Sequence, residues 1–221
     1  MANIYPTKED YESYWTGQQR RSKRRADTAI SPIFSDARDR VTGNTLAALN
    51  NRRYLRIDDP RRRLVAVRRD PKISQIEGII ARAAHRSLQS IFDNLGPHYE
   101  EEIPMICKDL YPWTDEIGSC SASLSKRELA GMRQEPFLGR TYREWIIINR
   151  NNAIKSWNNA FRAVMIGDIR TENKVSRDAQ LVTEIRKILN TQESRTKTVF
   201  ENAMIQTSRK GQVDVEAALW P

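Results

Sequence analysis

The chain has 221 residues, of which 39% are hydrophobic and 29% charged, and its mean hydropathy is −0.68. This length suits one or two domains, and the composition predicts a polar but folded protein rather than a disordered one. No apolar run is longer than the four residues at 145–148, which excludes a transmembrane helix, and the N-terminus lacks the pattern of a secretion signal.

The net charge of +9 is concentrated at one end of the chain. Residues 1–72 contain 17 Lys or Arg against 9 Asp or Glu, whereas residues 73–221 contain 20 against 19. We therefore expect two parts, a basic N-terminal arm of residues 1–72 and a helical core domain of residues 73–221.

Arginine dominates two basic clusters in the first 72 residues. A guanidinium presents a planar fork of donors that fits phosphate and carboxylate oxygens, so these side chains are candidate contacts for nucleic acid or an acidic protein surface. The alternatives are a solvated face without a partner and a nuclear-localisation string. The candidate residues are Arg20, Arg21, Lys23, Arg24, Arg25, Arg52, Arg53, Arg61, Arg62, Arg63, Arg68 and Arg69.

In chain order, the first expected element is a helix over residues 7–25 with Thr7 as its N-cap, followed by a second helix over residues 32–41. Between residues 52 and 69, short apolar runs flank the turn-prone string Asp58-Asp59-Pro60. This pattern predicts a basic β-hairpin or an extended arm. Because a lone hairpin is marginal in water, we expect it to lie against another element.

The rest of the chain predicts helices. Apolar residues from Ile73 to Leu95 fall on one helical face that ends at Gly96-Pro97, and a short helix is expected over residues 103–110. Thr141 and Glu144 form a capping-box pattern that opens a long helix ending at Gly167. Two further helices are expected, one from Ser176 over residues 179–189 and one over residues 193–210 that ends at Gly211. The fold class is therefore mainly α, with long amphipathic helices.

The sequence offers no strong catalytic or metal-binding pattern. His85, His98, Cys107 and Cys120 are nine to thirteen positions apart, whereas structural zinc sites use closely spaced ligand pairs, and both cysteines are expected to be free thiols. Neither a phosphate-binding glycine loop nor a nucleophile elbow occurs. We expect no enzyme activity, no cofactor and no metal; the remaining alternative is a metal-dependent nuclease that uses acidic residues of 100–102 or 115–116.

A family resemblance covers about the last third of the chain. Its motifs are Gly139-Arg140-Thr141-Tyr142 and Trp145 at the start of a long helix, Gly167, the 185–189 helix, and Arg195-Thr196-Lys197-Thr198 followed by Asn202, Ala203 and Gly211. Residues 139–211 thereby resemble the helical domain of minor head, or head-morphogenesis, proteins of tailed bacteriophages. Lys197 stands where that family often has Glu. The resemblance implies a low-copy structural protein at the portal or inside the head, linked with assembly, packaging or ejection of DNA.

Together these features favour a non-enzymatic structural protein of a tailed-phage virion, minor head or portal/neck-associated. Its helical body would dock on capsid or portal protein, and its arm would contact DNA or an acidic protein surface. The expected partners are other virion proteins (portal, capsid or neck) in a multi-subunit assembly, and DNA, with no membrane. The expected location is the virion, and the host cytoplasm during assembly. The alternative is a non-structural nucleic-acid-binding protein.

Overall fold

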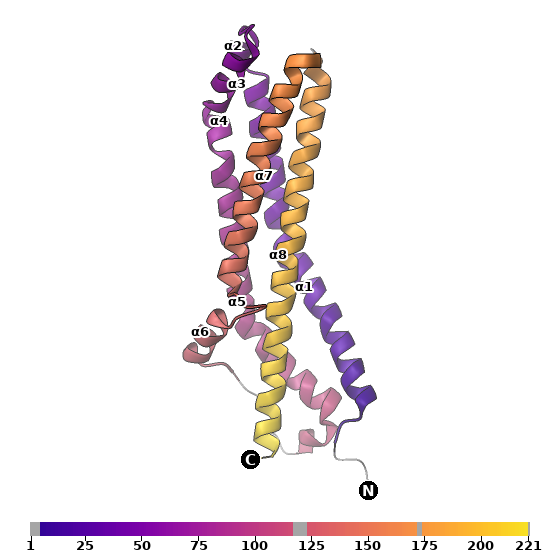
Figure 1. Ribbon diagram of the computed structural model, residues 1–221. Helices are drawn as coiled ribbons and strands as arrows, with labels where there is room; N and C mark the ends of the chain where they lie inside the picture. Colours follow the sequence, from indigo (N-terminus) through magenta and orange to yellow (C-terminus); the bar gives the residue numbers. More distant parts are fainter. Residues whose placement is uncertain (1–4, 117–122, 172–173, 221) are drawn as a thin grey trace. The chain divides into compact units, whose positions relative to one another are not determined.

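The computed structural model describes residues 5–116, 123–171 and 174–220, and within them the chain is helical with no strand (Figure 1). The mainly α fold class is confirmed. The elements are α1 (Lys8–Leu49), α2 (Arg52–Leu55), α3 (Pro60–Arg68), α4 (Pro71–Ser74), α5 (Ile76–Leu110), a 3₁₀ helix η1 (Pro112–Glu116), α6 (Lys126–Gln134), α7 (Tyr142–Thr171) and α8 (Lys174–Leu219).

The described residues pack as two compact units, each discontinuous in sequence. Unit 1 comprises residues 5–29, 88–116, 123–145 and 197–220, and unit 2 comprises residues 30–87, 146–171 and 174–196. Each of α1, α5, α7 and α8 contributes one segment to each unit. The described residues 5–72 therefore belong partly to each unit. The division into an arm of residues 1–72 and a core domain of residues 73–221 stays a prediction.

Unit 2 has an apolar core built from four helix segments. Along α1 the buried side chains Ile30, Phe34, Ala37 and Val41 recur three or four residues apart, so they form one stripe of the helix. Matching stripes on the other three segments are also buried: Ile76, Ile79, Ile80, Ala83 and Ala84 on α5, Ala153, Trp157, Phe161 and Met165 on α7, and Leu181, Ile185 and Leu189 on α8. The apolar face expected from Ile73 onward is confirmed on α5.

Unit 1 has a core that mixes apolar and polar groups. One part is a cluster of Tyr14, Tyr99, Ile103, Ile106, Cys107, Leu110, Tyr111 and Val215. Beside it, Gln18 donates to the hydroxyls of Ser22 and Ser208 at 2.7 and 3.0 Å, and all three side chains are fully buried. The hydrogen bond from Gln18 to Ser208 joins α1 to α8, so a buried polar contact replaces part of the apolar packing in this unit.

Two predicted helix starts are confirmed by their hydrogen bonds. The Thr7 hydroxyl accepts from the Asp10 N–H at 3.2 Å just before α1. Thr141 and Glu144 form the expected capping box at the start of α7, with the Thr141 N–H donating to Glu144 at 2.8 Å. Side-chain acceptors satisfy N–H groups that have no partner within the first helical turn.

The predicted hairpin at residues 52–69 is wrong, because this segment forms the short helices α2 and α3. The carboxylate of Asp59 accepts from the N–H groups of Arg61 and Arg62, and Pro60 occupies the first position of α3. Proline is favoured there because its missing N–H would be unpaired in any case. The Asp-Pro string therefore starts a helix instead of turning a hairpin, and Asp70-Pro71 does the same for α4.

Several predicted helix ends are also wrong. α5 continues through Gly96 and Pro97, α7 continues past Gly167, and the two expected C-terminal helices are one helix, α8, which contains Gly211. A Cβ added at Gly211 would lie 3.2 Å from the side chains of both Ile103 and Ile106. Glycine at this position allows α8 to approach α5 closely, so its role is in packing and not in ending the helix.

Cys107 is disulfide-bonded and buried, so the expectation of a free thiol is wrong for it. Cys120, the only other cysteine of the chain, lies outside the described residues. Among the residues that the structure describes, no helix combines the length and the apolarity that a membrane span requires.

Candidate functional site

In the first basic cluster, residues 20–25, some of the charged side chains form ion pairs within unit 1 and the others are exposed. In unit 1, Arg21 donates two hydrogen bonds to the carboxylate of Glu102, each of 3.0 Å, and Arg25 pairs with Glu101. Arg20, Lys23 and Arg24 are exposed. The cluster therefore offers three exposed cations to a partner, while two of its arginines hold α1 to α5.

The carboxylate that binds Arg21 is buried in unit 1. The Glu102 side chain is 2% exposed and also accepts from the Tyr14 hydroxyl at 2.8 Å. Burial and the Glu102 charge both raise the pKa of Tyr14, which keeps this hydroxyl protonated as a donor. Glu102, one of the acidic residues considered for a nuclease site, is thus buried, and Arg21 and Tyr14 together satisfy its charge.

The second basic cluster, residues 52–69 of unit 2, carries most of its arginines on the surface. We call this stretch, with α2 and α3, the basic segment; it contains eight arginines and two aspartates. The exposed candidate residues are Arg52, Arg53, Arg61, Arg62, Arg68 and Arg69. Arg63 is half-buried and donates through Nε to the Ile57 carbonyl at 2.8 Å, so it closes the turn between α2 and α3.

Local anchors fix the helices of the basic segment. Tyr54 of α2 is buried, and burial together with a hydrogen bond to Asp70 raises its pKa. Val67 of α3 is 1% exposed, and the Asp70 carboxylate caps α4 by accepting from the Lys72 N–H at 2.8 Å. Tyr54 and Val67 thus face inward, whereas Val65 is exposed together with most of the arginines along these short, capped helices.

The candidate metal ligands that the structure describes do not form a metal site. Within the described residues, no group of three or more His, Cys, Asp or Glu side chains is placed to hold a metal ion. His85 is exposed, whereas His98 is buried in unit 1 with its Nε2 within 3.1 Å of the Met204 carbonyl and 3.0 Å of the Ser208 hydroxyl. The side chains of Asp115 and Glu116 lie outside what the structure describes.

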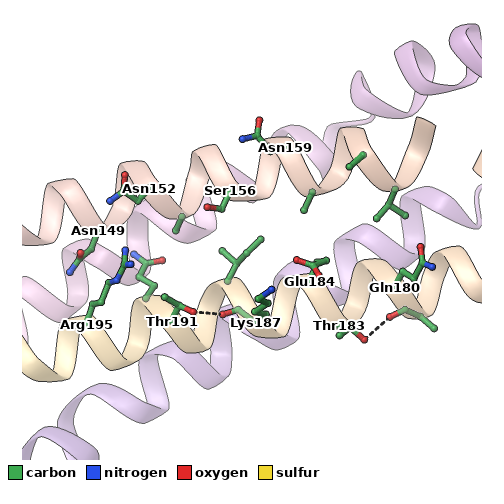
Figure 2. Close-up of a pocket in the computed structure, with 17 residues that line it drawn as sticks. Asn149, Asn152, Ser156, Asn159, Gln180, Thr183, Glu184, Lys187, Thr191 and Arg195 are labelled. Carbon is green, nitrogen blue, oxygen red and sulfur yellow. Dashed lines mark hydrogen bonds between the residues drawn. The ribbon is translucent and has the colours of Figure 1, made fainter. Parts of the chain in front are cut away.

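A groove of about 960 Å³ lies between α7 and α8 within unit 2. Figure 2 shows the labelled polar side chains of the two helices along it, with Arg195 of α8 extending toward Asn149 of α7. Its lining combines alanines with carboxamides, which are Asn149, Asn152, Asn159, Gln180 and Gln192. Nothing in the local sequence pattern predicts this groove.

Gln192 distinguishes this groove from ordinary surface. Its side chain is 3% exposed, and neither its amide nitrogen nor its amide oxygen has a hydrogen-bond partner among the described residues. A buried carboxamide without partners costs about 1–3 kcal/mol, so a complementary group in the groove would recover that cost.

The chain matches no protein-family model, no curated protein and no solved structure.

Proposed function

We propose that the protein is a non-enzymatic assembly protein of a tailed-phage virion whose basic segment binds DNA phosphates or an acidic protein surface. The observation that carries the binding role is the exposure of seven of the eight arginines in the basic segment. The virion assignment rests on the resemblance of residues 139–211 to minor head proteins. Virion proteins such as portal, capsid or neck protein are the proposed partners of the helical body.

The electrostatic balance of the basic segment supports a polyanionic partner. Asp59 directs one carboxylate oxygen to the N–H groups of Arg61 and Arg62, and its other oxygen is 3.5 Å from Nε of Arg62. That ion pair is exposed and therefore weak. The arginine side chains keep their positive potential, which favours association with phosphate or carboxylate groups.

Salt dependence of DNA binding tests the role of the basic segment. We expect the full-length protein to bind a labelled 30-base-pair duplex with an affinity that falls steeply with salt concentration. The triple substitution Arg53→Gln, Arg61→Gln and Arg68→Gln should make the slope of log K against log salt shallower, by about one for each phosphate that the variant no longer neutralises. The measurement is fluorescence anisotropy between about 50 and 200 mM salt.

A matched variant separates the basic segment from net charge. Arg127, Arg143 and Arg162 are exposed residues outside the segment, and replacing all three with Gln removes the same charge. We expect this control to leave the slope unchanged. Equal slopes for the two triple variants would refute the segment as the DNA contact, and binding to poly-glutamate in place of DNA would assign it to an acidic protein. Divalent-dependent DNA cleavage would contradict the non-enzymatic role, and absence from purified virions would contradict the assembly role.

A further inference from the structure

We propose that the α7–α8 groove of unit 2 is the docking site for an acidic helix of a partner protein that carries an Asn or Gln opposite Gln192. This proposal depends on the proposed function in one respect, which is that the partner is another protein of the assembly.

The dimensions of the groove fit one helix. Its lining runs from Asn149 to Val164 on α7 and from Ala179 to Arg195 on α8. At a rise of 1.5 Å per residue each wall is about 22–24 Å long, which is about four helical turns. Ala153, Ala160 and Ala163 recur along the α7 wall. Small side chains at such spacing let the backbone of a further helix come close enough for tight packing.

The buried amide of Gln192 specifies part of the occupant. Its nitrogen and oxygen need an acceptor and a donor at once. A second carboxamide meets both needs in a reciprocal pair, whereas a carboxylate or an ammonium group meets only one. The partner helix is therefore expected to place Asn or Gln at the level of Gln192, near the end of the groove where Arg195 and Asn149 lie (Figure 2).

The charges along the groove select an acidic occupant. Lys187 and Arg195 line it and are exposed, while Glu184 is its only lining carboxylate among the described residues. Lys155 and Arg162 are exposed on the same stretch of α7. A partner helix with Glu or Asp on its flanks would pair with these cations, and charge complementarity of this kind directs partner choice.

The same features disfavour two other occupants. A second copy of this chain would bring its own exposed cations against those of the first, so like charges would oppose the contact. Single-stranded nucleic acid binds on aromatic side chains that stack with its bases, and the described lining contains no aromatic residue.

The test uses the full-length protein and three synthetic helical peptides of about 16 residues, a length of about four turns. The first has an alanine face with flanking Glu residues and one Gln three residues from one end, because Gln192 lies three residues from the Arg195 end of the groove wall. The second has Lys in place of every Glu, and the third has Ala in place of the Gln. We expect the acidic peptide to bind at least about ten times more tightly than the basic one, and the Gln→Ala change to weaken binding about tenfold.

Two protein variants locate the binding. Ser156 is exposed and lines the groove, so Ser156→Trp should abolish peptide binding, whereas Asn151→Trp, at an exposed position of α7 outside the lining, should not. In Gln192→Leu the Gln→Ala change in the peptide should have no further effect, because the amide pair is already absent. Circular dichroism and gel filtration of each variant confirm that it is folded.

The proposal is overturned if the acidic peptide does not bind, if the basic peptide binds as tightly, or if Ser156→Trp leaves binding unchanged. Dimerisation or DNA binding that Ser156→Trp abolishes would assign the groove to one of the other occupants and would also overturn it. The variant with Arg53, Arg61 and Arg68 replaced by Gln should retain peptide binding. Failure of the DNA-binding proposal is therefore distinguishable from failure of this one.

Discussion

Replacing Arg21 with Met tests whether this arginine belongs to the fold rather than to a binding surface. Arg21 is 31% exposed at its side chain, but the Glu102 side chain that it pairs with is only 2% exposed. Arg21→Met keeps an aliphatic side chain against Tyr14 and leaves Glu102 buried with the Tyr14 hydroxyl as its remaining partner. Breaking a buried ion pair in this way costs about 3–5 kcal/mol.

The opposite substitution should cost less. Glu102→Gln keeps the shape of the side chain, and the partly exposed guanidinium of Arg21 can still be hydrated, so we expect a loss of about 1–2 kcal/mol. Replacing both residues with Met removes both charges and should cost less than the sum of the single Arg21→Met and Glu102→Met substitutions. For a chain of this length, each kcal/mol lowers Tm by about 2–4 °C.

Urea denaturation followed by circular dichroism measures these losses, with Arg20→Met as the control because Arg20 is exposed in the same cluster. Arg20→Met should stay within about 0.5 kcal/mol of the wild type. If Arg21→Met cost no more than this control, the pairing with Glu102 would contribute nothing to stability, and Arg21 would return to the set of candidate binding residues.

Two further predictions concern stability. Burial lowers the pKa of His98 to about 4, below the unfolded value of 6.5. Between these two pH values the unfolded chain binds more protons than the folded one. About 3 kcal/mol of stability that is present above pH 6.5 should therefore be lost as the pH falls to about 4. His98→Gln should flatten this dependence in urea titrations at several pH values, and the exposed His85→Gln should not. Gly211→Val should destabilise the protein by about 1–3 kcal/mol, because the added side chain would press on α5. Gly43→Ala, in open space on α1, should instead stabilise it by about 0.5–1 kcal/mol in the same assay. Equal destabilisation by the two substitutions would refute the packing role of Gly211.

Where apolar residues repeat at helical spacing and a cap precedes them, the fold could be predicted from the sequence. The face that begins at Ile73 and the capping box of Thr141 and Glu144 are both present as expected. Local patterns suffice here because the information lies within one or two turns of one helix.

The packing of α1 in unit 1 could not be predicted in this way. Its buried face carries Gln18 and Ser22 between Tyr14 and Ala26, and the partner of Gln18 on α8 is Ser208, 190 positions away. The spacing of hydrophobic residues does not reveal that a polar side chain is buried, because the burial of that side chain depends on a partner far away in the sequence. The residues therefore looked like part of a solvated arm.

Several prolines and glycines that were predicted to end helices lie inside them, because their effect depends on how the helix packs. Pro97 removes one hydrogen bond from α5, but packing on both sides of it, at Leu95 and at Tyr99, keeps the helix continuous. Gly211 is required by its contact with α5, more than a hundred positions earlier in the chain. The groove residue Gln192 was missed for a related reason, since nothing near it in the sequence shows that its amide is buried without a partner.

The two basic clusters show how carboxylates decide what an arginine can do. Around residues 20–25, Glu101 and Glu102 on a neighbouring helix bind arginines directly, so part of that charge is used within unit 1. In the basic segment Asp59, and directly after it Asp70, instead accept from backbone N–H groups as helix caps. A carboxylate that caps a helix stabilises the local backbone and offsets little of the side-chain charge around it. Residues 52–69 therefore keep most of their positive charge for a partner, which is why we assign the polyanion contact to this segment and not to the run at residues 20–25.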